Sequence, residues 1–289
     1  MLLFLRLILG FIIGAIIGVV IYLFYVRRKR RILKPIPKET RIEVLTKYHK
    51  YEMNVVRNKH TTRMVLNNPV PGILLKYNYI HYCNIDKKNK DDIVFRMLDF
   101  VCDNFKHDSN TPICGSGSLV SVIQSYEKMN LKTNCRGLAL ILAELLRMNG
   151  VKARHVTCKP YEEPFSDCHV VVDCLMPSGR RIMLDPTYRL YFIDDNGEYI
   201  SIAQFREGII KGRVFHYNKK ASYNGGAFNY DDYIEYMTKN IFRLNTNYIL
   251  NNNDAIESQI ELIPKGYSVD GYTKRVQYTT NSDYFWNID

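Results

Sequence analysis

One run of twenty uncharged, mostly apolar residues lies close to the N-terminus, at positions 7–26 (LILGFIIGAIIGVVIYLFYV). A helix of about 20 such residues crosses a hydrocarbon layer roughly 30 Å thick. A cleaved signal peptide is the alternative. However, the run is long for the apolar part of such a peptide, and Tyr25-Val26-Arg27 is not a small-residue cleavage site. We therefore expect a single transmembrane helix within residues 1–26.

Most of the positive charge directly follows this run. Of the formal net charge of +11, +8 lies between residues 27 and 50 and +1 at Arg6, which leaves only +2 for residues 51–289. Binding of nucleic acid would require basic residues on the folded part of the chain, so we expect no nucleic-acid partner. The positive-inside rule places the basic strip on the cytoplasmic face, where it can bind anionic lipid. We expect a single-pass membrane protein with a cytoplasmic catalytic domain, while the opposite orientation of a signal anchor stays open.

Gly10, Gly14 and Gly18 recur at every fourth position of the apolar run. Residues at this spacing share one helix face, and small side chains let a second helix approach closely. A homodimer through these glycines is therefore a further prediction, although small residues at this spacing are also common in helices that do not associate.

The seven cysteines are an odd number and include no CxxC pair. This pattern argues against a zinc ribbon or a thioredoxin-type site. It is more typical of reduced thiols in a cytoplasm than of a secreted disulfide framework. Nothing else in the sequence indicates a metal site or a cofactor, and we expect neither.

The remaining sequence predicts a mixed domain of helices and strands. Residues 27–90 are expected to form the basic strip and a connector, and residues 91–289 the folded domain, with its core at 91–193. Apolar residues at helical spacing predict helices over 91–105 and 135–149. The apolar period then changes to two, which predicts strands over 151–158, 168–175 and 181–184, with a turn at 177–179.

Cys135 stands at the start of the second helix, directly after the capping residues Thr133 and Asn134. A cysteine with an ordinary pKa of about 8.5 is only a few per cent thiolate at neutral pH, and the thiolate is the nucleophile. A helix N-terminus favours the thiolate, and its unpaired N–H groups could also bind an oxyanion. Cys135 is therefore a candidate nucleophile, although most cysteines are buried apolar residues.

A nucleophilic thiol also requires a base, and His169 is the best placed of the seven histidines, which are at 49, 60, 81, 107, 155, 169 and 216. It begins a strongly apolar strand, and a strand that carries a carboxylate folds back beside it. A turn centred near 177 and 178 places His169 opposite residues 185–188, which selects Asp185. Asp173 lies about 13 Å further along the same strand, so it cannot orient the ring.

Three segments together resemble the transglutaminase-like superfamily of papain-fold cysteine enzymes: NCRGLALILAELLRMNGVKARHV, DCHVVV and MLDPTYRLYF. The resemblance covers residues 131–192 and depends most on GVKAR at 150–154 and LDPT at 184–187. It implies an α+β fold with a papain-like core, in which the nucleophile helix packs on an antiparallel sheet. In this chain the core would be preceded by the single transmembrane helix.

Transferred onto this sequence, the resemblance implies that Cys135 is the nucleophile, His169 the general base and acid, and Asp185 the residue that orients the histidine. The expected protein is a membrane-anchored, cysteine-dependent hydrolase or acyltransferase. It would act on peptide or glutamine-type amides of a protein or peptide substrate, through an acyl-thioester. The alternative is a catalytically silent binding or scaffold domain of the same fold at the membrane.

The sequence also departs from the family pattern. The family commonly has Gly two positions before the cysteine and an aromatic residue shortly after the histidine, whereas this chain has Thr133, and Val170 with Val171. Gln124 and Tyr126 are the upstream candidates for a side-chain oxyanion donor. One further residue, Arg136, could flank the cleft and favour an acidic substrate, or could simply be solvated.

Overall fold

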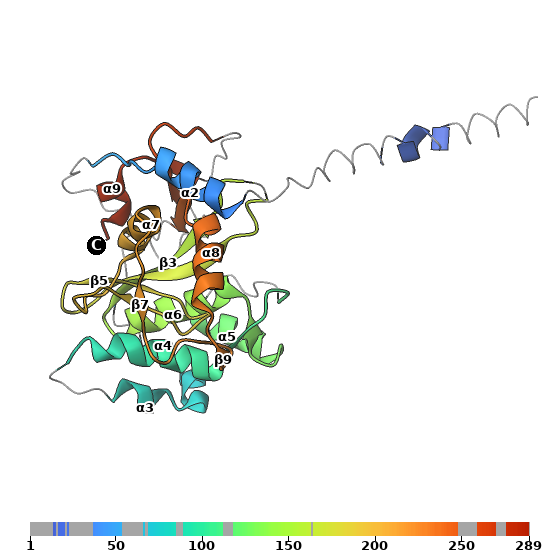
Figure 1. Cartoon of the computed structure of the whole chain (residues 1–289). Coiled ribbons are helices and arrows are strands. Elements are labelled where there is room, and N and C mark those ends of the chain that lie inside the picture. The colour runs from blue at the N-terminus through green and yellow to red at the C-terminus, as the bar shows by residue number, and fades with distance from the viewer. Residues whose placement is uncertain are drawn as a thin grey trace, which may run out of the picture. The chain divides into compact units, whose positions relative to one another are not determined.

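The computed structural model describes residues 14, 15, 17–20, 22, 37–53, 66, 69–84, 89–111, 118–162, 164–247, 259–269 and 276–288. The chain divides into two compact units, Met1–Ile36 and Pro37–Asp289. The helices and strands from α2 to α9 all belong to the second unit (Figure 1).

Among the described residues, none of the helices is both long and apolar enough to cross a membrane. The run at 7–26 lies mostly outside these residues, and only 14, 15, 17–20 and 22 of it are described, all as helix. The transmembrane helix and the dimer through Gly10, Gly14 and Gly18 therefore stay predictions.

A six-stranded sheet forms the centre of the second unit, in the order β12-β11-β10-β3-β4-β5. Neighbouring strands are antiparallel except β11 and β12, which are parallel. The strands are β3 (Lys152–Lys159), β4 (His169–Leu175), β5 (Arg181–Leu184), β10 (Arg243–Asn247), β11 (Gln259–Leu262) and β12 (Val276–Thr279).

Helices cover both faces of this sheet (Figure 1). One face carries α4 (Asp92–Asn104), α5 (Leu119–Glu127) and α6 (Cys135–Met148), with η1 (Gly72–Tyr77) and α3 (Tyr79–Cys83) against α4 and its neighbours. The other face carries α2 (Lys38–Lys47), α7 (Ile202–Ile210), α8 (Tyr230–Asn240) and α9 (Ser282–Trp286).

The strand β4 shows how the sequence specifies burial on both faces. Val170 and Val172 belong to the core shared with α4, α5 and α6, whereas Val171 belongs to the opposite core. Side chains alternate between the two faces of a strand, so a continuous apolar run is required where helices cover both. The α+β class and the helix α6 against β3 and β4 agree with the expected fold.

Among the described residues, three pairs of very short strands lie outside the main sheet, and two of these pairs contribute to the candidate site. β1 (Lys106–His107) pairs in parallel with β2 (Lys132–Thr133). The antiparallel pairs are β6 (Phe192–Ile193) with β7 (His216–Tyr217), and β8 (Ser222–Tyr223) with β9 (Gly226–Ala227).

Candidate active site

Cys135 is the first residue of α6, and the residues around it fix where this helix begins. Asn134 caps the helix, because its Oδ1 accepts a hydrogen bond from the Gly137 N–H at 3.1 Å. Gly137 is required by close packing, since a Cβ there would collide with Thr133 Oγ1 and with the Tyr126 hydroxyl. The half-buried Cys135 is thereby held at the helix N-terminus, where the sequence predicted it.

The short strand pair β1–β2 brings a distant loop to the start of α6. His107 lies opposite Thr133 in this pair, and the Asp108 N–H donates to the Thr133 carbonyl at 2.8 Å. Asn134 Nδ2 donates to the Thr111 carbonyl at 3.1 Å. The segment that follows α4 is therefore bonded directly to the residues that precede Cys135.

His169 and Asp185 meet at the edge of the sheet. His169 begins β4 and Asp185 follows β5, and the register of these strands places Val172 opposite Leu184. His169 Nε2 lies 2.6 Å from Asp185 Oδ2, and both side chains are buried. The contact agrees with the pairing expected from a turn near 177 and 178, which placed Asp185 opposite His169.

Two further donors hold the Asp185 carboxylate. The Thr187 N–H donates to Oδ1 at 2.9 Å, and the Tyr233 hydroxyl donates to Oδ2 at 2.9 Å. Because the carboxylate is fixed in this way, it also fixes the ring of His169 with Nε2 toward Asp185. The other ring nitrogen, Nδ1, is then the one left for Cys135.

Tyrosine rings surround His169. The centroids of Tyr188, Tyr233 and Tyr236 lie 6.0, 6.5 and 5.4 Å from the imidazole centroid, all in edge-on geometry. The Tyr236 hydroxyl also donates to the Cys168 carbonyl at 3.2 Å. The aromatic contacts of this histidine thus come from α8 and from the loop after Asp185, instead of from the residues that follow it in β4.

Cys135 and His169 shift each other's pKa in opposite directions. Burial raises the pKa of the Cys135 thiol, but hydrogen bonding to His107 and His169, and the charge of His169, lower it to about 6. Burial lowers the pKa of His169, but the charge of Asp185, its hydrogen bond and the interaction with Cys135 raise it to about 10. Between these values the pair is a thiolate beside an imidazolium, the form of a reactive cysteine.

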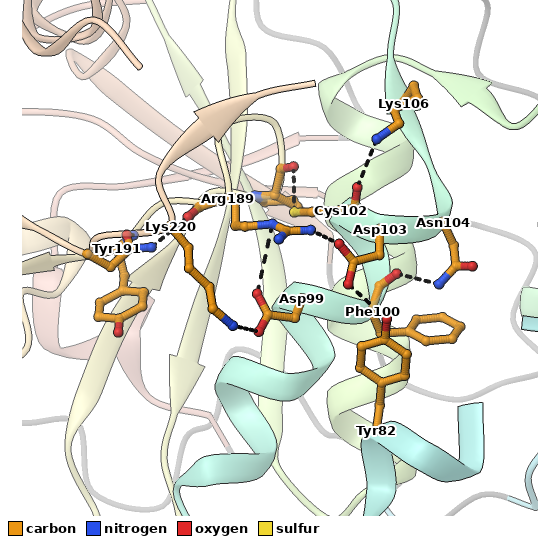
Figure 2. Close-up of polar contacts among 12 residues, drawn as sticks. Tyr82, Asp99, Phe100, Cys102, Asp103, Asn104, Lys106, Arg189, Tyr191 and Lys220 are labelled. Carbon is orange, nitrogen blue, oxygen red and sulfur yellow. Dashed lines mark hydrogen bonds and ion pairs between the residues drawn. The ribbon is translucent and has the colours of Figure 1, made fainter. Parts of the chain in front are cut away.

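The loop that carries Asp185 is fastened to α4 by a polar cluster (Figure 2). Arg189 pairs with Asp103, and its Nε lies 3.8 Å from Asp99 Oδ1. Lys220 Nζ binds the other carboxylate oxygen of Asp99 at 2.7 Å. Two carboxylates of one helix are therefore matched by two cations from the segment that follows Asp185.

Hydrogen bonds of the backbone also hold the loop that follows Asp185. The Cys102 thiol donates to the Pro186 carbonyl at 3.3 Å. Asp185 and Leu190 exchange two backbone hydrogen bonds, of 2.8 and 3.0 Å, and Arg189 between them has φ of 46°. A positive φ is costly for a residue with a side chain, so the ion pairs of Arg189 hold the loop in a conformation that it would not adopt by itself.

The other residues singled out from the sequence have different surroundings. Arg136 Nη2 donates to Thr157 Oγ1 at 3.0 Å, so its guanidinium lies against β3. Of the two upstream candidates for an oxyanion donor, Gln124 is exposed and Tyr126 is fully buried in the core between α5 and α6.

Sequence reasoning missed His107, Tyr233 and Tyr236. His107 lies in a strand of two residues, which is too short to show a periodic pattern. Tyr233 and Tyr236 are three residues apart and share one face of α8, a signal that was present in the sequence. It was not noticeable because the chain contains 22 tyrosines. Within the described part of the chain, no group of three or more His, Cys, Asp or Glu side chains could hold a metal ion.

Residues 82–186 match the model of the transglutaminase-like superfamily. This region includes Cys135, His169 and Asp185, and it agrees with the resemblance found in the sequence. At the level of sequence, no curated protein matches the chain.

Several solved structures are similar in part. One is a candidate cysteine protease from Cytophaga hutchinsonii, with 21% identity over 45% of this chain and 41% of that chain, and a TM-score of 0.31. A candidate protease from Parabacteroides distasonis has 14% identity over 44% and 27% of the two chains, with a TM-score of 0.30. The periplasmic domain of TgpA from Pseudomonas aeruginosa has 17% identity over 54% and 49%, with a TM-score of 0.31. The chain spans less than half the length of each of these structures, and likenesses at this level carry no functional argument.

Proposed function

We propose that this chain is a cysteine-dependent hydrolase or acyltransferase. Cys135 is the nucleophile, His169 the general base and acid, and Asp185 the residue that orients His169. The observation that carries the proposal is the double contact of His169, which bonds Asp185 through Nε2 and lowers the pKa of the Cys135 thiol. The match of residues 82–186 to the transglutaminase-like superfamily supports the same class of chemistry.

The first half-reaction forms an acyl-thioester. The Cys135 thiolate attacks the carbonyl carbon of an amide, a carbon–sulfur bond forms, and the carbonyl electron pair moves onto oxygen. The carbonyl then re-forms as the carbon–nitrogen bond breaks. The His169 imidazolium gives its proton to the departing nitrogen, so that an amine leaves and the histidine becomes neutral.

The second half-reaction releases the acyl group. Neutral His169 takes a proton from water or from an amine, whose oxygen or nitrogen bonds to the acyl carbon. The carbon–sulfur bond then breaks and the thiolate is restored. Water gives a carboxylic acid and an amine gives a new amide, so the same three residues serve both hydrolysis and transfer. Peptide and glutamine-type side-chain amides both fit this sequence of steps.

Acylation by 4-nitrophenyl acetate tests this proposal without knowledge of the natural substrate. We expect the full-length protein to release 4-nitrophenolate and to carry an acetyl group on Cys135, detected by mass spectrometry of its peptides. Cys135→Ser should abolish the labelling and His169→Ala should slow it strongly, whereas Cys168→Ser should retain it. Labelling of a different cysteine would contradict the proposal. A wild-type protein that remains unlabelled would favour the silent binding domain.

The proposal extends to the location of the enzyme. We place residues 7–26 across a membrane as a single span, with the basic residues 27–50 and the catalytic unit on the cytoplasmic side, because of the charge bias at the end of the run. Protease treatment of sealed, right-side-out cells tests this arrangement. The catalytic unit should be protected until the membrane is permeabilised, and its digestion from outside would reverse the assigned orientation.

A further inference from the structure

His107 is a second histidine beside the sulfur of Cys135. The parallel pairing of β1 with β2 places it opposite Thr133, two residues before the cysteine. Hydrogen bonding to His107 is one of the interactions that counteract the effect of burial on the thiol. The strand pairing thus places His107 beside the start of α6, and both imidazole rings act on the thiol. Only the ring of His169 also bonds Asp185.

A turn from a distant part of the chain holds the backbone of His107 from two directions. Asn224 Oδ1 accepts from the His107 N–H at 2.8 Å, and Asn224 Nδ2 donates to the His107 carbonyl at 3.0 Å. Asn224 and Gly225 join β8 to β9 and have φ of 50° and 84°, the left-handed conformation that Asn and Gly adopt most readily in two-residue hairpins. The hairpin conformation therefore holds the Asn224 side chain against the backbone of His107.

The same hairpin also fixes the ring of His107. The Tyr223 hydroxyl lies 3.0 Å from Nδ1, and the two rings meet edge-on with centroids 5.6 Å apart. With Nδ1 engaged by Tyr223, Nε2 is the nitrogen available to the sulfur. If the hydroxyl donates to Nδ1, the proton of the ring is on Nε2, and His107 presents an N–H donor to Cys135.

An N–H donor at the sulfur also lies next to the place where negative charge develops during acylation. The carbonyl oxygen of a substrate is two bonds away from the sulfur once the carbon–sulfur bond has formed. Donors aimed at this oxygen stabilise the tetrahedral intermediate, and loss of one such donor lowers the rate by about 100- to 1000-fold. Gln124 is exposed on α5 and Tyr126 lies in the core between α5 and α6, whereas His107 is half-buried and fixed in position beside the start of α6.

We propose that His107 is a further catalytic residue, whose Nε2–H donates to the Cys135 sulfur in the resting site and to the oxyanion of the tetrahedral intermediate. This inference depends on the proposed thiol chemistry. His107 transfers no proton in the step: the carbon–sulfur bond forms, the carbonyl electron pair moves onto oxygen, and the N–H of His107 hydrogen-bonds that oxygen. When the carbonyl re-forms, His169 protonates the leaving group as before.

Two reagents separate this role from activation of the thiol. Iodoacetamide alkylates a thiolate by direct displacement and forms no tetrahedral oxyanion, whereas 4-nitrophenyl acetate forms one. We expect His107→Leu in the full-length protein to lower the rate of acetylation of Cys135 by about 100-fold. The rate of its alkylation at the same pH should change far less. His107→Gln keeps an N–H donor and should recover part of the acetylation rate.

His216→Gln is the matched control, because His216 is an exposed histidine that pairs with Asp195. It should leave both rates unchanged. Equal rates of acetylation in wild type and His107→Leu would overturn the role of His107 while the thiol chemistry stands. An equal fall in both rates, in variants that melt like the wild type, would show that His107 activates the sulfur only, and would also overturn it. A wild-type Cys135 that is alkylated but never acetylated would remove the proposed function together with this inference.

Discussion

At the scale of single residues, the surroundings of Cys135 differ from those of the other described cysteines. Burial is the main reason for a raised pKa of the thiol at all five others: Cys83, Cys102, Cys158, Cys168 and Cys174. Burial of the half-buried Cys135 raises its pKa as well, yet hydrogen bonds to His107 and His169 and the charge of His169 lower this pKa to about 6. Burial alone therefore keeps these thiols protonated, and hydrogen bonding to the thiolate favours the ionised form of one of them.

The pH dependence of alkylation follows from this difference. The thiolate of Cys135 is the reactive form, and it is present above the lowered pKa of about 6. We therefore expect the rate of alkylation by iodoacetamide to rise through about pH 6 and to reach a plateau by neutral pH. In His169→Ala the thiolate loses its main positive partner, so the midpoint should move up in pH. Acylation by an amide also requires protonated His169 to protonate the departing nitrogen, so its rate should fall again as pH rises toward 10.

Peptide mapping after each reaction provides the control, since only alkylation at Cys135 should follow this profile. Cys168 neighbours His169 in sequence, but the pKa of its thiol is raised. Its alkylation should therefore increase only at alkaline pH. If the pH dependence of alkylation of Cys135 in the wild type coincided with that of Cys168, the ion pair between the Cys135 thiolate and the His169 imidazolium would be contradicted.

The residues of the candidate site differ in how far the sequence could predict them. Cys135 and His169 open regular elements, so capping and apolar periodicity pointed to both. The position of a turn and the register of two strands predicted that Asp185 contacts His169. The contacts of His107 depend on Asn224, far along the chain, and no local pattern connects these two positions. Sequence reasoning succeeds here where one element positions the residue, and it fails where a tertiary contact does.

At the scale of elements, the loop after β5 is the part of the site that most depends on outside support. It must hold Asp185 against His169 although its own backbone includes a residue with positive φ. Arg189 supplies that support through Asp99 and Asp103 of α4 (Figure 2). These ion pairs connect α4, the helix predicted over 91–105, to the candidate site, because they position the loop that carries the Asp185 carboxylate.

We expect Arg189→Ala to act on catalysis more than on stability. The ion pairs are partly exposed, with Arg189 at 19% and Asp103 at 43% side-chain exposure, so their loss should lower the free energy of unfolding by only about 1 kcal/mol. The rate of acetylation of Cys135 should fall about tenfold, because small displacements of catalytic groups have large effects on rate. Urea denaturation and 4-nitrophenyl acetate kinetics measure the two quantities.

Arg180→Ala is the matched control for this prediction. Arg180 also pairs with two carboxylates, those of Asp91 and Glu198, but it lies at the turn on the opposite end of β5. Its loss should leave the rate of acetylation unchanged. If both variants lowered the rate equally, the effect would reflect the net charge of the protein. The ion pairs of Arg189 with Asp99 and Asp103 would then have no specific role in catalysis.

At the scale of the whole molecule, the sequence predicted one half of the central sheet and missed the other. The strands β3, β4 and β5 are apolar and were expected, whereas β10, β11 and β12 were not. The sequence of β10, RLNTN, has the composition of a surface loop, yet four of its five residues are buried. Its buried polar side chains have partners: Arg243 and Asn245 bind Glu261 at 3.1 and 3.2 Å, and Thr246 donates to the His155 carbonyl at 2.7 Å. Buried polar strands are recognisable only once their partners are known.

The aromatic residues near the C-terminus are packed into the fold. Phe285 is fully buried in the core on the face of the sheet that α2, α7 and α8 cover. The last carbonyl groups of α9 accept hydrogen bonds from two arginines of the sheet. Arg154 Nη2 donates to the Phe285 carbonyl at 2.7 Å, and Arg181 Nη2 donates to the Trp286 carbonyl at 2.9 Å. Cations at the C-terminal end of a helix satisfy carbonyl groups that lack partners within it.

This arrangement gives a structural role to the arginine of the GVKAR segment. Arg154 is fully buried, and its Nε lies 3.1 Å from Asp173, the carboxylate that the sequence excluded from the active site. We expect Arg154→Met to lower the free energy of unfolding by about 3 kcal/mol, because removal of one partner leaves a buried charge poorly compensated. Trp286 is the single tryptophan of the chain and lies over Arg154, with the guanidinium 5.6 Å from the ring centroid. Urea denaturation followed by its fluorescence and by circular dichroism therefore reports on the C-terminal helix and on the whole unit.

The double variant Arg154→Met/Asp173→Leu separates the effect of charge from that of packing. If the unpaired carboxylate causes the loss, its removal should restore part of the stability, because an apolar pair of similar size can replace a buried ion pair. Arg181 also binds Asp173, at 2.5 Å, but it is partly exposed and can turn toward water when its partner is gone. A double variant less stable than Arg154→Met would mean that Asp173 still stabilises the fold through its contact with Arg181. Recovery of the circular dichroism transition without recovery of the tryptophan signal would show that the sheet tolerates the exchange while the C-terminal helix still requires Arg154.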